Sequence, residues 1–187
     1  VLRSQINPHF LYNTLELIRA AAIRGDAGKV SLITSAIGKI YRYTAKGEPF
    51  VPLSQEMDIV KAYVNIQQAR FQNRITTLYS VSKEAARVPV FKMLLQPLVE
   101  NAFVHGLEPK PDNGVLYVGA KTEEGLLWIT IRDNGVGIAP ERLEELERQL
   151  AAKVIDTSSH LGLVNIDARL KLQYGEDYGL GISSAPG

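Results

Sequence analysis

The spacing of apolar residues changes character along the chain, from a helical period in its first part to short alternating runs from Ile75 onward. Helical spacing covers Pro8 to about Arg24 and, after a break at Gly25-Asp26, resumes from Val30 to Thr44. The short connection predicts a hairpin of two amphipathic helices. Because two short helices cannot bury their apolar stripes alone, we expect two copies of the chain to form a homodimer through a four-helix bundle.

A third helix and then a mixture of strands and helices follow the hairpin. Ser54, a weak N-cap residue, opens a helical run that reaches Gln72. The alternating runs predict three strands, the last two joined by a turn, and a closing strand: Ile75–Val81, Gly114–Thr122, Gly125–Asp133 and Tyr178–Ala185. Helical spacing predicts further helices within 90–107, 142–153 and 164–175. This order predicts an α+β fold, in which a two-layer α/β sandwich follows the hairpin.

The composition excludes several kinds of site. The 187 residues include no cysteine, which excludes disulfides and thiolate zinc sites, so any metal should be held by oxygen ligands. Apolar runs stay well short of the roughly 20 residues that a membrane span needs. The chain begins inside a predicted helix, and we therefore expect it to be a piece of a longer protein.

The net charge of +1 is unevenly distributed. Residues 1–48 hold seven Lys and Arg against three Asp and Glu, a net +4, and residues 49–187 hold fourteen against seventeen, a net −3. The first segment would favour an acidic partner. No nucleic-acid partner is expected, because the basic residues form no dense run and no aromatic residues interleave with them.

The first of four polar clusters is VENAFVHG, near the end of the helical run 90–107. Helical geometry places Asn101 and His105 one turn apart on the same face, with Glu100 about 100° to the side. An amide oxygen suits Mg²⁺, which commonly takes only one or two protein ligands, and an imidazole can meet phosphate. Taken alone, the cluster fits the ordinary polar end of a helix equally well.

Two clusters that contain glycine follow. In DNGVGI, Gly135 and Gly137 allow positive φ and let a ligand approach the backbone, while Asp133 ends a strand with a carboxylate able to accept from an exocyclic amine. In SSHLGLVN, a helix that starts near Leu163, just after Gly162, would offer free N–H groups to phosphates. Alone, the first cluster also fits a plain turn and the second a capped helix start. No GxxxxGK[ST] loop occurs, which excludes a Walker-type nucleotide site.

The fourth cluster is NPHFLYN, in which His9 follows Pro8 in the first turn of the first predicted helix. Asn13 lies one turn further on the same face, where it could orient the imidazole or a water. A neutral imidazole is a competent nucleophile near neutral pH if its second nitrogen is held or deprotonated. A lone histidine on a helix is more often structural, so this cluster gains weight only from the other three.

In this order the four clusters resemble the LytS/YesM type of two-component sensor histidine kinase, whose ATPase domain has the Bergerat fold of the gyrase, chaperone, histidine kinase and mismatch-repair (GHKL) superfamily. LRSQINPHFLYNTL is similar to the phosphoacceptor segment of that family, LLQPLVENAFVHG to its N box, DNGVGI to its G1 box, and SSHLGLVNIDARLKLQYG to its G2 box with the following helix. The resemblance covers nearly the whole chain. It implies a dimerisation and phosphotransfer hairpin at 1–48 and an ATP-binding domain at 49–187.

The resemblance implies that the chain is an ATP-dependent protein histidine kinase. His9 would take the γ-phosphoryl group of ATP and pass it to an aspartate on the receiver domain of a response regulator. Asn13 would be a candidate for the reverse, phosphatase activity. The chain would be the cytoplasmic part of a membrane sensor, attached through upstream segments that lie outside this sequence.

The other residues implied by the resemblance form a pocket for ATP and Mg²⁺. Asn101 would bind the metal and Asp133 the adenine amine, while Glu100 would orient water and His105 would contact phosphate. The pocket and its lid would be shaped by Gly135, Gly137, Gly162 and Leu163, with the lid itself between Gly137 and Gly162.

Two positions depart from the family pattern. Many histidine kinases carry an acidic residue directly after the phosphoacceptor, where Phe10 stands here, so the base that serves His9 stays open. His160 stands where a first lid glycine often occurs, and we favour a surface role for it over a phosphate contact. Two rival interpretations also stay open: an ATP-driven conformational module without histidine phosphorylation, and a scaffold with a vestigial nucleotide pocket.

Overall fold

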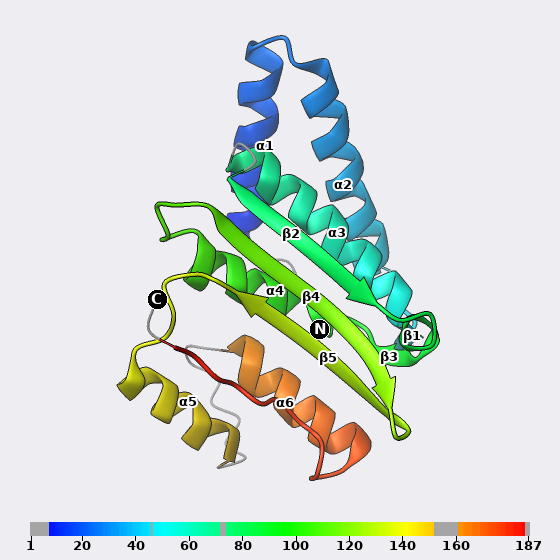
Figure 1. Cartoon of the computed structure of the whole chain (residues 1–187). Coiled ribbons are helices and arrows are strands. Elements are labelled where there is room, and N and C mark those ends of the chain that lie inside the picture. Colours follow the sequence, from blue (N-terminus) through cyan, green and yellow to red (C-terminus); the bar gives the residue numbers. More distant parts are fainter. Residues whose placement is uncertain (1–7, 46, 72–73, 152–160, 186–187) are drawn as a thin grey trace.

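The computed structural model describes residues 8–45, 47–71, 74–151 and 161–185. Within these residues the elements follow in the order α1 (Pro8–Ile23), α2 (Ala27–Ala45), β1 (Phe50–Pro52), α3 (Leu53–Arg70), β2 (Ile75–Val81), η1 (Ala85–Arg87), β3 (Pro89–Phe91), α4 (Leu95–Asn101), η2 (Ala102–Leu107), β4 (Gly114–Glu123), β5 (Leu126–Asp133), α5 (Pro140–Ala151) and α6 (Leu161–Tyr174). The hairpin of α1 and α2 extends away from the sheet (Figure 1). None of the helices in this described part is both long and apolar enough to span a membrane.

The hairpin turns where the sequence interrupts its helical spacing. Gly25 adopts a left-handed conformation with φ +72°, which glycine reaches without steric cost. The carboxylate of Asp26 accepts a hydrogen bond of 2.8 Å from the N–H of Lys29 and so caps the start of α2. The apolar face of α2 packs along α3, so part of the hairpin is buried within a single chain.

The main sheet of the described chain has the order β2-β4-β5, with β2 parallel and β5 antiparallel to β4. The strand predicted at Ile75–Val81 is confirmed with the same bounds, and the next two are confirmed to within one residue. Glu124 and Gly125 form the turn between β4 and β5 with φ values of 52° and 79°. Helices α3 and α4 lie behind this sheet (Figure 1), while Trp128 on the other face is 54% exposed, so the predicted two-layer α+β arrangement is confirmed.

The helical run predicted within 90–107 has a more complex structure. Its first residues belong to β3, which pairs antiparallel with β1, and α4 begins only at Leu95. After Asn101 the helix widens into the π-helical turn η2, in which the N–H of Glu108 donates to the carbonyl of Phe103, 2.8 Å away and five residues back. Such wide turns occur frequently at functional sites. Here the turn carries Gly106 toward the end of β5.

Two local predictions are wrong. Ser54 is not the N-cap of α3, because that helix begins at Leu53 and its N-cap position, Pro52, makes no side-chain hydrogen bond. No strand forms within the described residues of 178–185. This segment is held by side chains instead: Asp167 accepts a bond of 2.8 Å from the N–H of Leu180, and the hydroxyl of Ser184 accepts one of 2.9 Å from the N–H of Ile138.

The buried carboxylate of Glu56, near the start of α3, joins three helices. Its side chain is 1% exposed and accepts hydrogen bonds from the N–H groups of Met93 and Leu95, each 2.9 Å away, and from the hydroxyl of Tyr43 on α2. Burial, followed by the hydrogen bond to Glu56, raises the pKa of the Tyr43 phenol well above its ordinary value. Tyr43 therefore stays protonated and keeps its role as donor.

Replacing Glu56 with Ala is expected to destabilise the fold by about 3 kcal/mol or more, because two buried N–H groups and a phenol lose their acceptor, at roughly 1–3 kcal/mol for each unsatisfied group. Urea unfolding followed by circular dichroism measures this loss. Asp58→Ala is the matched control on the same helix: its ion pair with Lys39 is exposed, and such pairs contribute about 0–1 kcal/mol. Equal losses for the two variants would contradict the role given to Glu56.

Candidate functional site

The end of α4 meets the first turn of α6. A Cβ atom added at Gly162 would lie 3.2 Å from the amide nitrogen of Asn101, so a residue larger than glycine would press on that side chain. Leu163 follows in the same turn and is partly buried. The observed α6 begins at Leu161, two residues before the predicted start. Thus the structure brings Asn101, Gly162 and Leu163 together at one end of the candidate nucleotide site.

The other end of this site is a close approach between two glycines. A Cβ atom at Gly135 would overlap the carbonyl group of Gly106, and one at Gly106 would lie 2.5 Å from Oδ1 of Asp133. The N–H of Val136 donates to the carbonyl of Gly106 at 3.1 Å, and the N–H of Gly135 donates to Asp133 Oδ1 at 2.9 Å. No side chain fits between these segments, so the backbone of η2 packs directly against that of the DNGVGI loop. We refer to Asn101, Gly106, Asp133, Gly135 and Gly162 together as the nucleotide cradle.

The DNGVGI loop is fixed by its own residues. Gly137 has φ +73°, the left-handed region that favours glycine. The side chain of Asn134 accepts a hydrogen bond of 2.6 Å from the N–H of Val115 and so ties the loop to β4. Asp133 stays exposed at the end of β5, where its carboxylate can accept from a ligand.

His105 is exposed on η2, directly before Gly106. The prediction singled out His105 but not Gly106, although a glycine inside a helical run can signal a packing requirement. Ser158, Ser159 and His160 lie outside the described residues, as do all of residues 152–160, the part of the expected lid between α5 and α6. Among the residues that are described, no group of three acidic or histidine side chains could hold a metal. Asn101 carries an amide oxygen, which is a ligand type that magnesium accepts.

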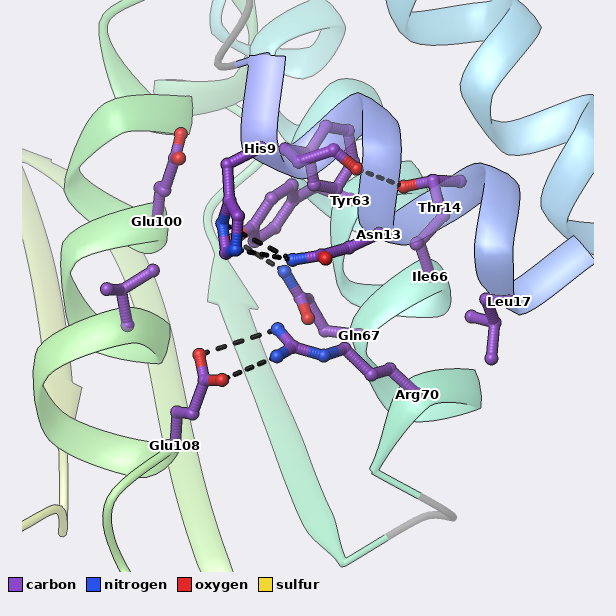
Figure 2. Close-up of a pocket in the computed structure, with 12 residues that line it drawn as sticks. His9, Asn13, Thr14, Leu17, Tyr63, Ile66, Gln67, Arg70, Glu100 and Glu108 are labelled. Atoms are coloured by element: carbon purple, nitrogen blue, oxygen red, sulfur yellow. Dashed lines mark hydrogen bonds and ion pairs between the residues drawn. The ribbon is translucent and has the colours of Figure 1, made fainter.

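His9 lies at a different place, in a cavity of about 90 Å³ between α1, α3 and the helical segment α4–η2 (Figure 2). The amide nitrogen of Asn13 lies 3.2 Å from Nε2 and 3.3 Å from Nδ1 of the imidazole, so the predicted pairing of these two side chains is present. Glu100 also lines the cavity. Asn101, the next residue of α4, has its side chain beside Gly162 and does not line this cavity. Glu100 and Asn101 thus belong to two separate candidate sites.

Phe10 holds α1 in this position. Its side chain is 7% exposed, and its ring centroid lies 5.1 Å from that of Tyr63 on α3. The Tyr63 ring in turn meets Phe103 of η2 edge to face at 5.7 Å. At the position where many histidine kinases carry an acid, this chain therefore has a packing residue that anchors the histidine-bearing helix.

Comparison with known proteins shows the family of the chain. Residues 1–75 match the family model described as histidine kinase, and residues 88–187 match the one described as histidine kinase-, DNA gyrase B-, and HSP90-like ATPase. The resemblance stated from the motifs is thereby confirmed, and the match indicates a domain that uses ATP.

Several curated relatives match almost the whole chain but are much longer. The chain is 35% identical to the sensor histidine kinase YesM of Bacillus subtilis over 98% of its own length and 30% of that protein. It is 32% identical to the sensor histidine kinase BtsS of Escherichia coli over 100% of its own length and 31% of that protein. It is 34% identical to the sensor protein LytS of Oceanobacillus iheyensis over 98% of its own length and 32% of that protein. The chain thus spans about a third of the length of these relatives. Since the ATPase model covers more than half of its residues, the chain belongs to the family of histidine kinase-, DNA gyrase B- and HSP90-like ATPases.

Proposed function

We propose that this chain is the catalytic region of a sensor histidine kinase, which phosphorylates its own His9 with ATP and passes the phosphoryl group to an aspartate of a response regulator. One observation carries the proposal. The segment α4–η2 lines the His9 cavity through Glu100 and forms part of the nucleotide cradle through Asn101 and Gly106, so one structural element borders both the cavity of the proposed phosphoacceptor and the candidate nucleotide site.

The chemistry of the transfer follows from the groups present. An imidazole nitrogen of His9 forms a bond to the γ-phosphorus while the bond to the bridging oxygen breaks, ADP leaves, and the proton on the other ring nitrogen passes to a base. Asn13 would orient the ring during this step, consistent with its 3.2 Å contact. Glu100 lines the same cavity, which supports its assignment to the chemistry.

The nucleotide would be held by the cradle. The carboxylate of Asp133 would accept from the adenine amine, while Gly135 and Gly137 would let the nucleotide approach the backbone. Gly162, Leu163 and His105 would contact its phosphates. Asn101 would hold a magnesium ion, which would neutralise the phosphate charge when bound.

The two sites must approach each other for transfer. His9 lies in the cavity beside Glu100, whereas Asn101 faces α6, so α1 must leave its packing position or meet the nucleotide of a second copy. We propose that residues 1–48 swing relative to residues 49–187 about the joint at Gly47–Pro52, a motion that must break the packing of α2 on α3 and the hydrogen bond from Tyr43 to Glu56.

A homodimer is part of the proposal. Four large apolar side chains of the hairpin stay between 46% and 73% exposed in the single chain: Tyr12, Leu15, Ile23 and Leu32. A second hairpin would cover them in a four-helix bundle. We also propose that the chain is the cytoplasmic part of a membrane sensor, and that it binds a receiver domain but no nucleic acid.

Incubating the chain with γ-labelled ATP and Mg²⁺ is expected to label the protein with an acid-labile, base-stable adduct that maps to His9. His9→Gln should abolish the label while leaving the increase in melting temperature on ATP addition unchanged. If the chain binds ATP but never acquires the label, the alternative of an ATP-driven conformational module is favoured instead.

ATP with Mg²⁺ is expected to raise the melting temperature, since a ligand at a hundred times its Kd adds about 2.7 kcal/mol of stability. Asp133→Asn should remove most of this increase, because it removes the negative charge and replaces one carboxylate oxygen by an amide N–H₂ group, a donor that cannot accept from the adenine amine. Gly135→Ala should also remove it by disturbing the cradle. Asp58→Asn, on the exposed side of α3, serves as the control and should keep the full increase.

Leu15→Glu is expected to convert the dimer to a monomer, because it places a charge in the apolar stripe of the hairpin. Size-exclusion chromatography with light scattering measures the change in mass. Leu172→Glu is the matched control, because Leu172 is 90% exposed on α6, away from the hairpin. A wild-type chain that runs as a monomer at micromolar concentration would contradict the four-helix bundle.

A further inference from the structure

The cavity beside His9 carries more polar groups than the anchoring of a helix requires. Besides His9 and Asn13 it is lined by Gln67 and Arg70 of α3 and by the carboxylates Glu100 and Glu108 (Figure 2). Its volume of about 90 Å³ is several times the minimum needed for one water. Neither Gln67 nor Arg70 belongs to the nucleotide cradle, so the proposed function has so far given them no role.

Gln67 is the first sign of a ligand. It is 4% exposed, its amide nitrogen lies 2.7 Å from the hydroxyl of Tyr63, and within the described residues its buried carbonyl oxygen has no hydrogen-bond partner. The nitrogen and oxygen of such an amide can exchange places. Burial, and next the nearby Glu100, raise the pKa of Tyr63 well above its ordinary value, so its hydroxyl stays protonated and can donate to the oxygen. The exchanged amide then offers its N–H₂ to an acceptor in the cavity.

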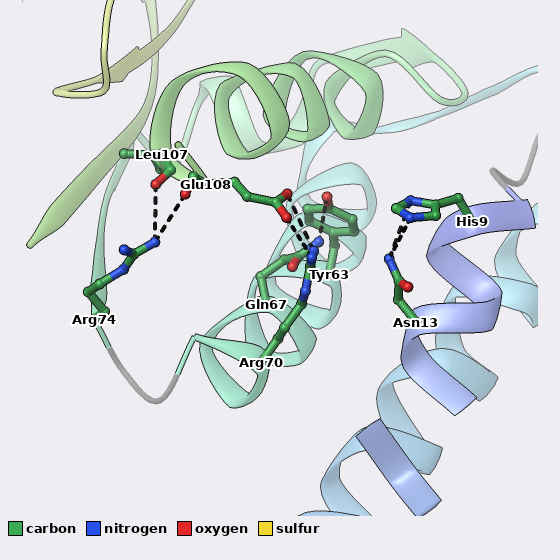
Figure 3. Close-up of polar contacts among 8 residues, drawn as sticks. All are labelled: His9, Asn13, Tyr63, Gln67, Arg70, Arg74, Leu107 and Glu108. Atoms are coloured by element: carbon green, nitrogen blue, oxygen red, sulfur yellow. Dashed lines mark hydrogen bonds and ion pairs between the residues drawn. The ribbon is translucent and has the colours of Figure 1, made fainter. Parts of the chain in front are cut away.

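Arg70 is the second sign. Its guanidinium lies 2.5 Å from Oε1 and 3.4 Å from Oε2 of Glu108 (Figure 3), and both side chains are about one-third exposed, at 32% and 35%. An ion pair this exposed gives little net stabilisation, and a doubly charged phosphoryl group is a stronger partner for a guanidinium than one carboxylate. Arg74 already reaches the carbonyl of Glu108 at 3.4 Å, so it can take over the released carboxylate.

We propose that this cavity binds the phosphoryl group of phosphorylated His9 within the same chain, with Arg70 and Gln67 as its binding residues. The inference rests on the proposed phosphorylation of His9. Arg70 exchanges Glu108 for the phosphoryl oxygens, and Gln67 donates to them through its N–H₂. Glu100, the carboxylate that stays in place, opposes the phosphoryl charge. The bound state is therefore a temporary one from which the group passes on.

The test uses phosphoramidate, which phosphorylates histidine without ATP: the imidazole nitrogen forms the new bond to phosphorus, the P–N bond of the reagent breaks, and ammonia leaves. Phosphorus NMR then follows the titration of the phosphoryl group on the whole chain. An adjacent guanidinium favours the dianion, so the wild-type midpoint is expected at a pH about one unit below that of Arg70→Gln. Arg70→Lys should recover part of the difference, and Glu100→Gln should lower the midpoint further.

Arg19→Gln is the matched control, because Arg19 is on α1 but pairs with Glu16 outside the cavity. Equal titration midpoints for wild type and Arg70→Gln would overturn the inference. A wild-type midpoint above that of the variant would also overturn it, because the carboxylates Glu100 and Glu108 would then affect the phosphoryl group more strongly than Arg70 does. If ATP labels His9 but Arg70→Gln leaves the midpoint unchanged, the proposed function stands and the binding site does not. If Arg70→Gln shifts the midpoint after phosphoramidate treatment but ATP never labels His9, the cavity binds a phosphoryl group on His9 and the proposed ATP-dependent phosphorylation is wrong.

Discussion

The hydrogen bonds of the Glu56 carboxylate determine where α4 begins, and both candidate sites depend on that helix. Met93 precedes α4 with a positive φ of 63°, an uncommon conformation for a residue with a side chain, and its N–H and that of Leu95 both donate to Glu56. With its start fixed, α4 presents Asn101 to α6 and Glu100 to the His9 cavity. The π-helical turn that follows then carries Gly106 against Gly135. A buried polar group outside both sites thus helps to set their positions.

The aromatic contacts of Tyr63 determine where His9 lies in the folded structure. Phe10 packs on Tyr63, and Tyr63 on Phe103, so one ring of α3 joins the hairpin to the segment that carries the nucleotide residues. Exposing the Phe10 ring costs roughly 1.5–3 kcal/mol, and the burial of Thr14 and Ala21 on the same helix adds to the free energy needed to move α1. In the proposed function, the position of His9 beside Glu100 is a resting position, and an upstream signal has to supply this free energy to change its population.

The spacing of apolar residues predicted most helices and strands well, because it reflects which side chains of each element face the core. The strand at Ile75–Val81 and both helices of the hairpin came from spacing alone, and three of the four motifs contain the residues of the cradle, although Gly106 was not singled out among them. Contacts between distant segments were not predictable in this way. The approach of Gly106 to Gly135 depends on the widened turn after Asn101, and the alternation in 178–185 did not reveal that Asp167 and Ser184 would replace strand pairing there. The packing role of Phe10 likewise depends on Tyr63, 53 positions later in the sequence.

The placement of two sites on one helical segment makes them dependent on each other. In the proposed function, nucleotide bound against Asn101 and Gly106 would act on the same segment whose Glu100 and Val104 line the His9 cavity. If nucleotide binding shifts this segment, it changes the free energy with which α1 docks, and the docking of α1 must change nucleotide affinity by the same amount. A sensor that moves the hairpin can therefore control the use of ATP without contacting the nucleotide. In this proposal the shared segment provides a physical connection between the His9 cavity and the nucleotide cradle.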